Sequence, residues 1–336
     1  MESLISKAKL AISSHSTNDY KIRPSEFGEE LNAAAPEIAA ILGHSLFREI
    51  AKRYEQYDSE AVRQQAKFKV FALDATWAVC ISAISGSLLA GLAALALESS
   101  IYLHYAAFML GATSTIFGSF ALFRLTQIRN EKLLEQWMSA RARAEIERLG
   151  LFLAMAKYIL DRHEVEFYTH LLFACFFKRY QLDVQYTYYS VRGAEHQKSH
   201  EKTSIISAAA AISLALGSGF LGMLGAFLPE VLPFAVLGTI GAAVAVVASR
   251  REELNQDERN AERYNRTADI LSRIAEKYDD VLEVIETGTN PHILIEYVDA
   301  VNDQLSLEHR QWTSDTSEMS SSIRALEKSL VELNKG

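Results

Sequence analysis

The hydrophobic and polar positions of this chain are separated into long blocks. Four stretches contain no Asp, Glu, Lys or Arg, and they form two close pairs: Ala75–Leu97, Ser99–Phe123, Thr203–Phe227 and Val231–Ser249. As helices of 19 to 25 residues they extend about 28 to 38 Å, enough to cross a hydrocarbon core of roughly 30 Å. Because a chain of 336 residues cannot easily bury four such helices in a soluble core, the pattern predicts four transmembrane helices in two hairpins.

Positive charge lies outside each pair and is missing from the tips between its members. The flanking basic residues are Lys67, Lys69, Arg124, Arg129, Lys198, Lys202, Arg250 and Arg251. The tips carry Glu98 and Glu230 instead. By the positive-inside rule, we expect both termini and the middle segment to face the cytoplasm.

The remaining sequence is charged and has the spacing of helices. Apolar residues recur at helical intervals over 130–161, and nothing alternates at period two. We therefore expect an all-α membrane protein with cytosolic helical extensions. Its five parts are N-terminal cytosolic helices (1–72), hairpin one (73–124), a cytosolic helical middle (125–202), hairpin two (203–250) and C-terminal cytosolic helices (251–336). The apolar segment Leu171–Phe177 is too short for a span, so it is either a core element or a contact with the bilayer surface.

Overall composition adds mainly exclusions. Hydrophobic residues make up 49% and charged residues 23%, which are ordinary averages that conceal the uneven distribution. The net charge of −8 argues against bulk attraction to nucleic acid. Two cysteines, Cys80 and Cys175, are too few for a disulfide framework.

Small residues recur within the four apolar stretches and predict close helix packing. The glycines expected at these contacts are Gly86, Gly118, Gly217, Gly222 and Gly238. The segment 217–222 also matches the dinucleotide fingerprint G-x-G-x-x-G. A dinucleotide site needs a strand before that motif, whereas here it lies inside an apolar stretch, so we expect no cofactor.

Hydroxyl side chains are the main polar groups of the apolar stretches, where His104 is the one histidine. The absence of mid-membrane charge argues against a pump or a coupled carrier. Serines suited to line a narrow water-filled pore are Ser82, Ser85, Ser114, Ser207 and Ser218. The alternative for each serine is a hydrogen bond to the backbone carbonyl one turn back, which is the more common arrangement.

The charged segments contain no motif that indicates an enzyme. His196 and His200 are four residues apart, but they lack the glutamate of a zinc protease and stand beside lysines, so we expect no metal. Arg141, Arg143 and Arg148 are candidates to sense a phosphate-bearing ligand. Glutamates interleave with these arginines, and a salt-bridged helix is the stronger interpretation.

Three segments resemble the SLATT family of bacterial membrane effectors. They are the Gln/Tyr-rich segment 185–194, the Trp/Arg/Glu-rich segment 131–145, and the segment 297–301 leading to Glu308 and Trp312. The chain is similar to two such two-span units in tandem over about 45–312. The second unit departs from the first, with Tyr264 in place of Trp137 and Ala268 in place of Arg141.

The resemblance implies a function in anti-phage defence. SLATT proteins are thought to permeabilise the bacterial inner membrane after a nucleotide signal, and the Hailong system pairs a nucleotidyltransferase with a SLATT channel opened by an oligonucleotide. We therefore expect a gated homo-oligomeric channel, with a tetramer favoured, in the lipid bilayer. Its partners would be a nucleotide or oligonucleotide activator and a cognate nucleotidyltransferase as genetic partner. The alternative is a non-conducting membrane scaffold that recruits cytosolic partners.

Overall fold

The computed structural model describes residues 3–12, 28–95, 101–162, 167–225, 227, 236–290 and 292–333, and every regular element in these ranges is a helix. The first seven are α1 (Leu4–Ile12), α2 (Gly28–Ala34), α3 (Pro36–Leu42), α4 (Ser45–Leu95), α5 (Ile101–Asn130), α6 (Leu133–Leu160) and α7 (Phe167–Phe177). The others are η1 (Lys178–Asp183), α8 (Val184–Leu214), η2 (Ala215–Leu221), α9 (Gly222–Gly225), α10 (Val236–Asn255), α11 (Asp257–Glu276), α12 (Tyr278–Thr287) and α13 (Ile293–Leu333). The all-helical class is thus as the sequence predicted.

Three helical runs in the described part of the chain are long and apolar enough to cross a membrane. They are Ser45–Leu92, Ile101–Asn130 and Phe167–Leu221. The fourth predicted stretch begins at Val231, and residues 228–235 lie outside the described ranges. Its described part, Val236–Ser249, is a shorter apolar helix.

The chain divides into two compact units, each built from segments that are distant in sequence. The first unit contains residues 1–63, 136–195 and 259–314. The second contains residues 64–135, 196–258 and 315–336, which include all four apolar stretches. α4 and α8 each continue without a break from residues of the first unit to residues of the second.

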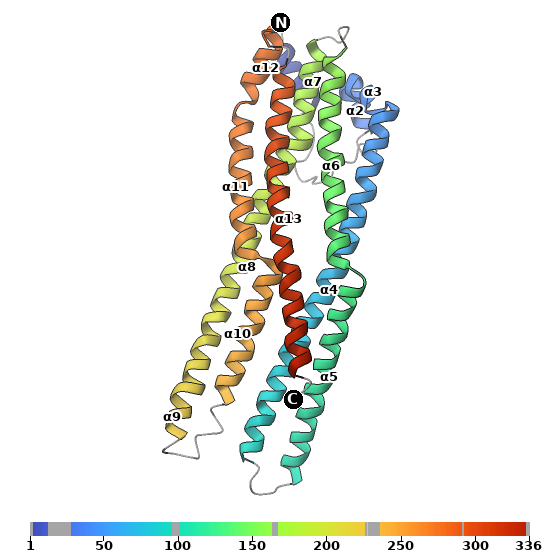
Figure 1. Ribbon diagram of the computed structural model, residues 1–336. Helices are drawn as coiled ribbons and strands as arrows, with labels where there is room; N and C mark the ends of the chain where they lie inside the picture. Colours follow the sequence, from blue (N-terminus) through green and yellow to red (C-terminus); the bar gives the residue numbers. More distant parts are fainter. Residues whose placement is uncertain are drawn as a thin grey trace. The chain divides into compact units, whose positions relative to one another are not determined.

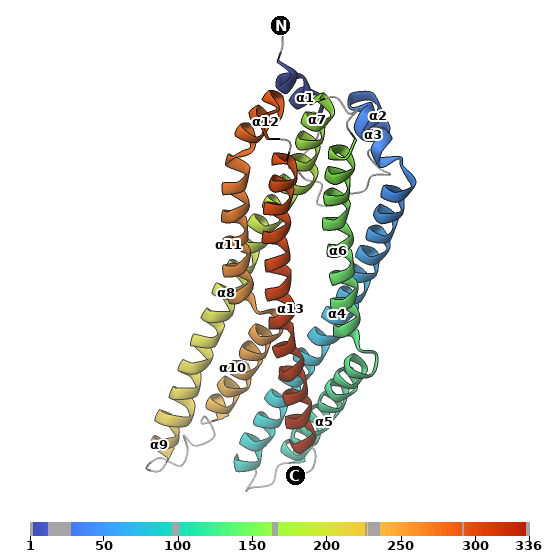
Figure 2. The same cartoon turned by 45° about the horizontal axis from the view of Figure 1, so that its top comes forward.

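The core of the first unit surrounds α7. All residues from Leu171 to Phe177 are buried, so this short apolar segment is a core element. α1, α3 and α12 contact α7, and Figure 2 shows α1 and α3 beside it. Phe177 packs edge-on against Phe152 of α6 and Tyr297 of α13. In Figure 1, α13 lies between α11 and α6.

A single residue in the left-handed conformation follows the second apolar helix of each pair. Lys132, with φ of 49°, separates α5 from α6, and Gln256, also with φ of 49°, separates α10 from α11. L-residues adopt this conformation at some energetic cost, and it interrupts a helix because the backbone leaves the right-handed region. The same break therefore occurs twice, at corresponding places after the two helix pairs.

The helical run that contains α7 and α8 changes its period at η1. In this π-helical segment, residues five apart fall on one face. Lys178 and Asp183 have this spacing, and both carboxylate oxygens of Asp183 lie 2.8 Å from the Nζ of Lys178. The π-helical turn therefore places Lys178 and Asp183 on one face, where they form this ion pair.

Candidate functional site

A buried ion network joins the helices of the first unit. Its acidic members are Glu145 of α6 and Glu308 of α13, and its most buried basic members are Arg148 of α6 and Arg263 of α11. Each of these four residues is less than one tenth exposed. Charged groups are rarely buried this far unless they are paired, because leaving water is costly.

Glu145 lies between two arginines of its own helix. One carboxylate oxygen is 2.6 Å from Nη2 of Arg141, and the other accepts a hydrogen bond from Arg148. Burial opposes ionisation of Glu145, but the two guanidinium groups together outweigh it and hold the pKa of this carboxyl below its usual value. Glu145 is therefore ionised at neutral pH.

Glu308 has a different electrostatic environment. It accepts a 2.8 Å hydrogen bond from the hydroxyl of Tyr189 on α8, and its other oxygen is 3.3 Å from Nε of Arg263. Burial raises the pKa of Glu308, and Arg263 and Tyr189 only partly offset it. The two buried carboxylates of the network are thus shifted in opposite directions.

The start of α4 also carries residues of this network. Arg53 forms a two-pronged bond with Glu147, at 2.8 and 3.0 Å, and Asp58 lies 3.7 Å from Arg141. Paired hydrogen bonds of this kind fix the relative orientation of the two side chains as well as attracting them. The network therefore fixes the start of α4 against α6.

The three proposed ligand-sensing arginines have different surroundings. Arg141 and Arg148 are paired with Glu145, as the salt-bridged interpretation expects. Arg143 is exposed, and its guanidinium lies 5.7 Å from the ring centre of Tyr57. Among the three, Arg143 is the one most accessible to a ligand.

In the second unit, α4 and α5 cross through a reciprocal contact of two serines and two glycines. Ser82 donates to the backbone carbonyl of Ser114 at 2.8 Å, and Ser114 donates to that of Ser82 at 3.0 Å. A Cβ atom added at Gly118 would lie 3.2 Å from Oγ of Ser82, and one added at Gly86 would lie 3.5 Å from Oγ of Ser114. Each helix therefore presents a serine and, four residues later, a glycine to its neighbour.

α10 packs even more closely against the end of α8 and η2. A Cβ added at Gly217 would lie 2.0 Å from the backbone nitrogen of Gly238, and one at Gly241 would lie 2.8 Å from the carbonyl oxygen of Ala210. Such distances leave room only for hydrogen at these positions. Small residues that let helix backbones approach are typical of membrane helix pairs.

The remaining serines and glycine named from the sequence are not part of these two helix contacts. Ser85 is buried and Ser207 is half-buried. Neighbouring hydroxyls make the local bond to the carbonyl four residues back, as in Thr113, Thr115 and Ser213. Ser218 and Gly222, two further residues named from the sequence, belong to η2 and α9, but the structure does not describe the surroundings of their side-chain positions.

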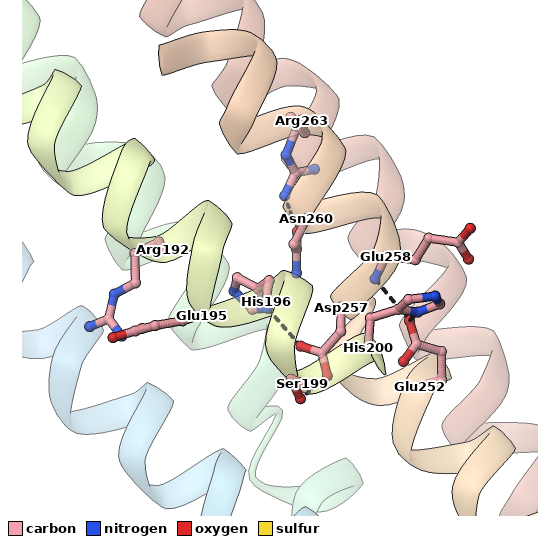
Figure 3. A network of polar contacts seen from close by, with 10 residues as sticks. All are labelled: Arg192, Glu195, His196, Ser199, His200, Glu252, Asp257, Glu258, Asn260 and Arg263. Atoms are coloured by element: carbon pink, nitrogen blue, oxygen red, sulfur yellow. Dashed lines mark hydrogen bonds and ion pairs between the residues drawn. The ribbon is translucent and has the colours of Figure 1, made fainter. Parts of the chain in front are cut away.

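A separate polar network lies at the base of the α8–α10 pair, which is the end where α10 is followed by α11 (Figure 3). Nδ1 of His196 donates to Asp257 at 2.6 Å, and Ser199 donates to the other carboxylate oxygen. Burial opposes ionisation of Asp257, but the hydrogen bonds from His196 and Ser199, together with the nearby charge of Arg251, lower the pKa of Asp257. His200, on the same face of α8, lies beside Glu252 of α10.

Several residues of the two polar networks have no role predicted from the sequence. Arg263 and Asp257 carry no signal, because a charge on a helix usually faces solvent. Tyr189, Glu308 and Trp312 stand out in the sequence only as parts of the family resemblance. The structure brings these segments together, since Tyr189 bonds to Glu308 and the ring centres of Trp137 and Trp312 are 5.6 Å apart.

Comparisons of the chain with protein-family models, with curated proteins and with solved structures find no match.

Proposed function

We propose that this protein is a gated, homo-oligomeric ion channel of the bacterial inner membrane and an effector of anti-phage defence. In this proposal four helices span the membrane in two hairpins, and both termini lie in the cytoplasm. A nucleotide or oligonucleotide made by a cognate nucleotidyltransferase binds the cytosolic helices and opens the pore.

The continuity of α4 carries the proposal. One unbroken helix contains Arg53 and Asp58, which belong to the ion network, and Ser82 and Gly86, which belong to the contact with α5. Rigid helices and ion-pair networks with alternative discrete arrangements are the elements that transmit coupling between sites. A ligand that rearranges the network would therefore act on the same helix that lies against α5.

The energy required for gating is attainable. Taking a channel from 1% to 99% open requires about 5.5 kcal/mol of preference for the open state, which several subunits can share. The ligand must bind the open form more tightly, since equal affinity for both forms shifts nothing. The exposed guanidinium of Arg143 is a suitable contact for a phosphate group.

Ion flux through liposomes containing the purified protein tests the proposal. Flux that depends on one member of a panel of cyclic and linear oligonucleotides is expected. A folded, oligomeric protein that gives no flux with any of them would count against nucleotide gating. A nucleotidyltransferase gene beside this one would support the signalling class independently.

A non-conducting scaffold is the second candidate, and one observation favours it. Ser82 and Ser114 bond to each other across the α4–α5 pair and do not need a pore to be satisfied. Replacing both with alanine tests whether these serines line a pore or only pack the two helices. Changed unitary conductance would assign them to the conducting pathway, whereas reduced thermal stability with unchanged conductance would assign them to packing alone.

A further inference from the structure

Three potential metal ligands from three helices meet at the base of the α8–α10 pair. They are His200 of α8, Glu252 of α10 and Glu258 of α11, and one donor atom from each lies within 4.8 Å of the other two. All three residues belong to the second unit. Glu258 is exposed, whereas His200 and Glu252 are half-buried.

The two inner ligands leave donor atoms unused. Nδ1 of His200 and Oε2 of Glu252 are buried and have no hydrogen-bond partner among the described residues. Nδ1 of His200 lies 3.5 Å from Oε1 of Glu252. Two ligands on a tetrahedral zinc ion, each at about 2.0 to 2.1 Å, are about 3.3 Å apart. The pair is therefore already close to the spacing that a shared metal ion requires.

The backbone fixes the third ligand near the first two. Gln256, with φ of 49°, interrupts the helix between Glu252 and Glu258, and the amide of Glu258 donates to Oε1 of Glu252 at 2.9 Å. Asp257, in the same connection, is bonded by His196 and Ser199 of α8 (Figure 3). These contacts hold the turn against the helix that carries His200. Hydrogen bonds to the ligands themselves orient them in metal sites, and here the Glu258 amide supplies such a bond to Glu252.

We propose that His200, Glu252 and Glu258 bind a divalent transition metal ion of the zinc type. Imidazole nitrogen and carboxylate oxygen are both zinc ligands, and the imidazole nitrogen disfavours calcium and magnesium, which prefer oxygen ligands. A water molecule would complete the tetrahedron. The ion would tie α8 to α10 and α11 beside the ends of two apolar stretches, and this holds whether or not the protein conducts ions.

The sequence alone argued against this site because two lysines are close to the histidines. In the structure, Lys198 and Lys202 are exposed, whereas His196, Ser199 and His200 are half-buried on the opposite side of α8. The carboxylates come from residues more than 50 positions later in the chain. A search for histidine spacing within one helix cannot find them.

Zinc titration of the full-length protein in detergent, followed by isothermal calorimetry, tests the proposal. One zinc ion per chain is expected, with affinity reduced at least tenfold by His200→Ala and by Glu252→Gln, and with little heat from magnesium or calcium. Matched controls are His292→Ala and Glu201→Gln, which change exposed residues outside the cluster and should bind zinc like the unmodified protein.

A spectroscopic measurement keeps the test independent of whether the variants fold. Cobalt(II) added to the unmodified protein should give the visible absorption of tetrahedral coordination, and zinc should displace it. The proposal fails if the folded, unmodified protein binds neither metal stoichiometrically. It also fails if binding persists at full affinity in well-folded His200→Ala and Glu252→Gln variants.

Discussion

The hydroxyl of Tyr189 on α8 donates a 2.8 Å hydrogen bond to the carboxylate of Glu308 on α13, although the two residues are 119 positions apart. Both side chains are buried. The same carboxylate lies 3.3 Å from Arg263, so one acidic group ties together α8, α11 and α13 within the first unit. The ion network therefore holds helices of the first unit together, in addition to being the proposed sensing site.

The stability of the bundle should depend on Glu308. Glu308→Gln keeps the size of the side chain and a hydrogen bond to Tyr189 but leaves Arg263 as a buried charge without its carboxylate. Breaking a buried pair in this way costs about 3 to 5 kcal/mol of unfolding free energy. Chemical unfolding in detergent, followed by tryptophan fluorescence, measures the loss.

Two further variants interpret that result. Asp303→Asn removes an exposed carboxylate of α13 and should leave stability within about 0.5 kcal/mol of the unmodified protein. Adding Arg263→Met to Glu308→Gln removes the buried positive charge that has lost Glu308 and should restore part of the stability. Equal losses in the single and double variants would contradict the ion-pair explanation.

Glu145 should make part of the stability dependent on pH. The pKa of Glu145 is lower in the folded protein than in the unfolded chain. At pH values between the two pKa values, the unfolded chain therefore binds more protons than the folded protein. The stabilisation is fully present above the ordinary glutamate pKa of about 4.3 and is lost as the pH falls through the lower folded value. The Glu145→Gln variant lacks this contribution.

Thermal melting of the two proteins between pH 7 and pH 3 measures this contribution. The difference in melting temperature should be constant above about pH 5 and should shrink at lower pH, because both proteins then carry a neutral group at position 145. A difference that stays the same down to pH 3 would show that ionisation of Glu145 does not stabilise the fold.

The close contact between Gly217 and Gly238 should tolerate no side chain. In Gly217→Ala the new Cβ would meet backbone atoms of α10, which cannot rotate away, so we expect a loss of about 3 kcal/mol. Gly219→Ala is the matched control, since none of the described atoms lies within 4 Å of the position that a Cβ would take there. Comparable melting temperatures for the two variants would exclude this tight crossing.

Arg143 should affect activation without affecting folding. If its exposed guanidinium contacts a phosphate of the activator, Arg143→Ala should raise the half-maximal activating concentration about tenfold, the equivalent of about 1.4 kcal/mol. Liposome flux measures that concentration, and Arg266→Ala, on an exposed arginine of α11, serves as control. An unchanged activation curve for Arg143→Ala would remove this residue from the proposed sensing site.

The sequence by itself determined the helical class and the positions of the apolar helices. Both follow from local properties, because helical spacing and the absence of charge over about 20 residues are read directly along the chain. It also indicated that Arg141 and Arg148 would pair with interleaved glutamates, since residues three and four apart share a helix face. The segment Leu171–Phe177 remained open between core and bilayer surface.

Only the tertiary structure decided which distant residues meet. Leu171–Phe177 became a core element because α1, α3 and α12 cover it. Glu308 contacts Tyr189, and His200 contacts Glu252, because helix packing brings these remote segments together. Residue spacing within one helix cannot predict such pairs. Local patterns determine where each helix lies in the sequence and which of its residues are apolar. The partner of a buried charge depends instead on which distant helices pack against it.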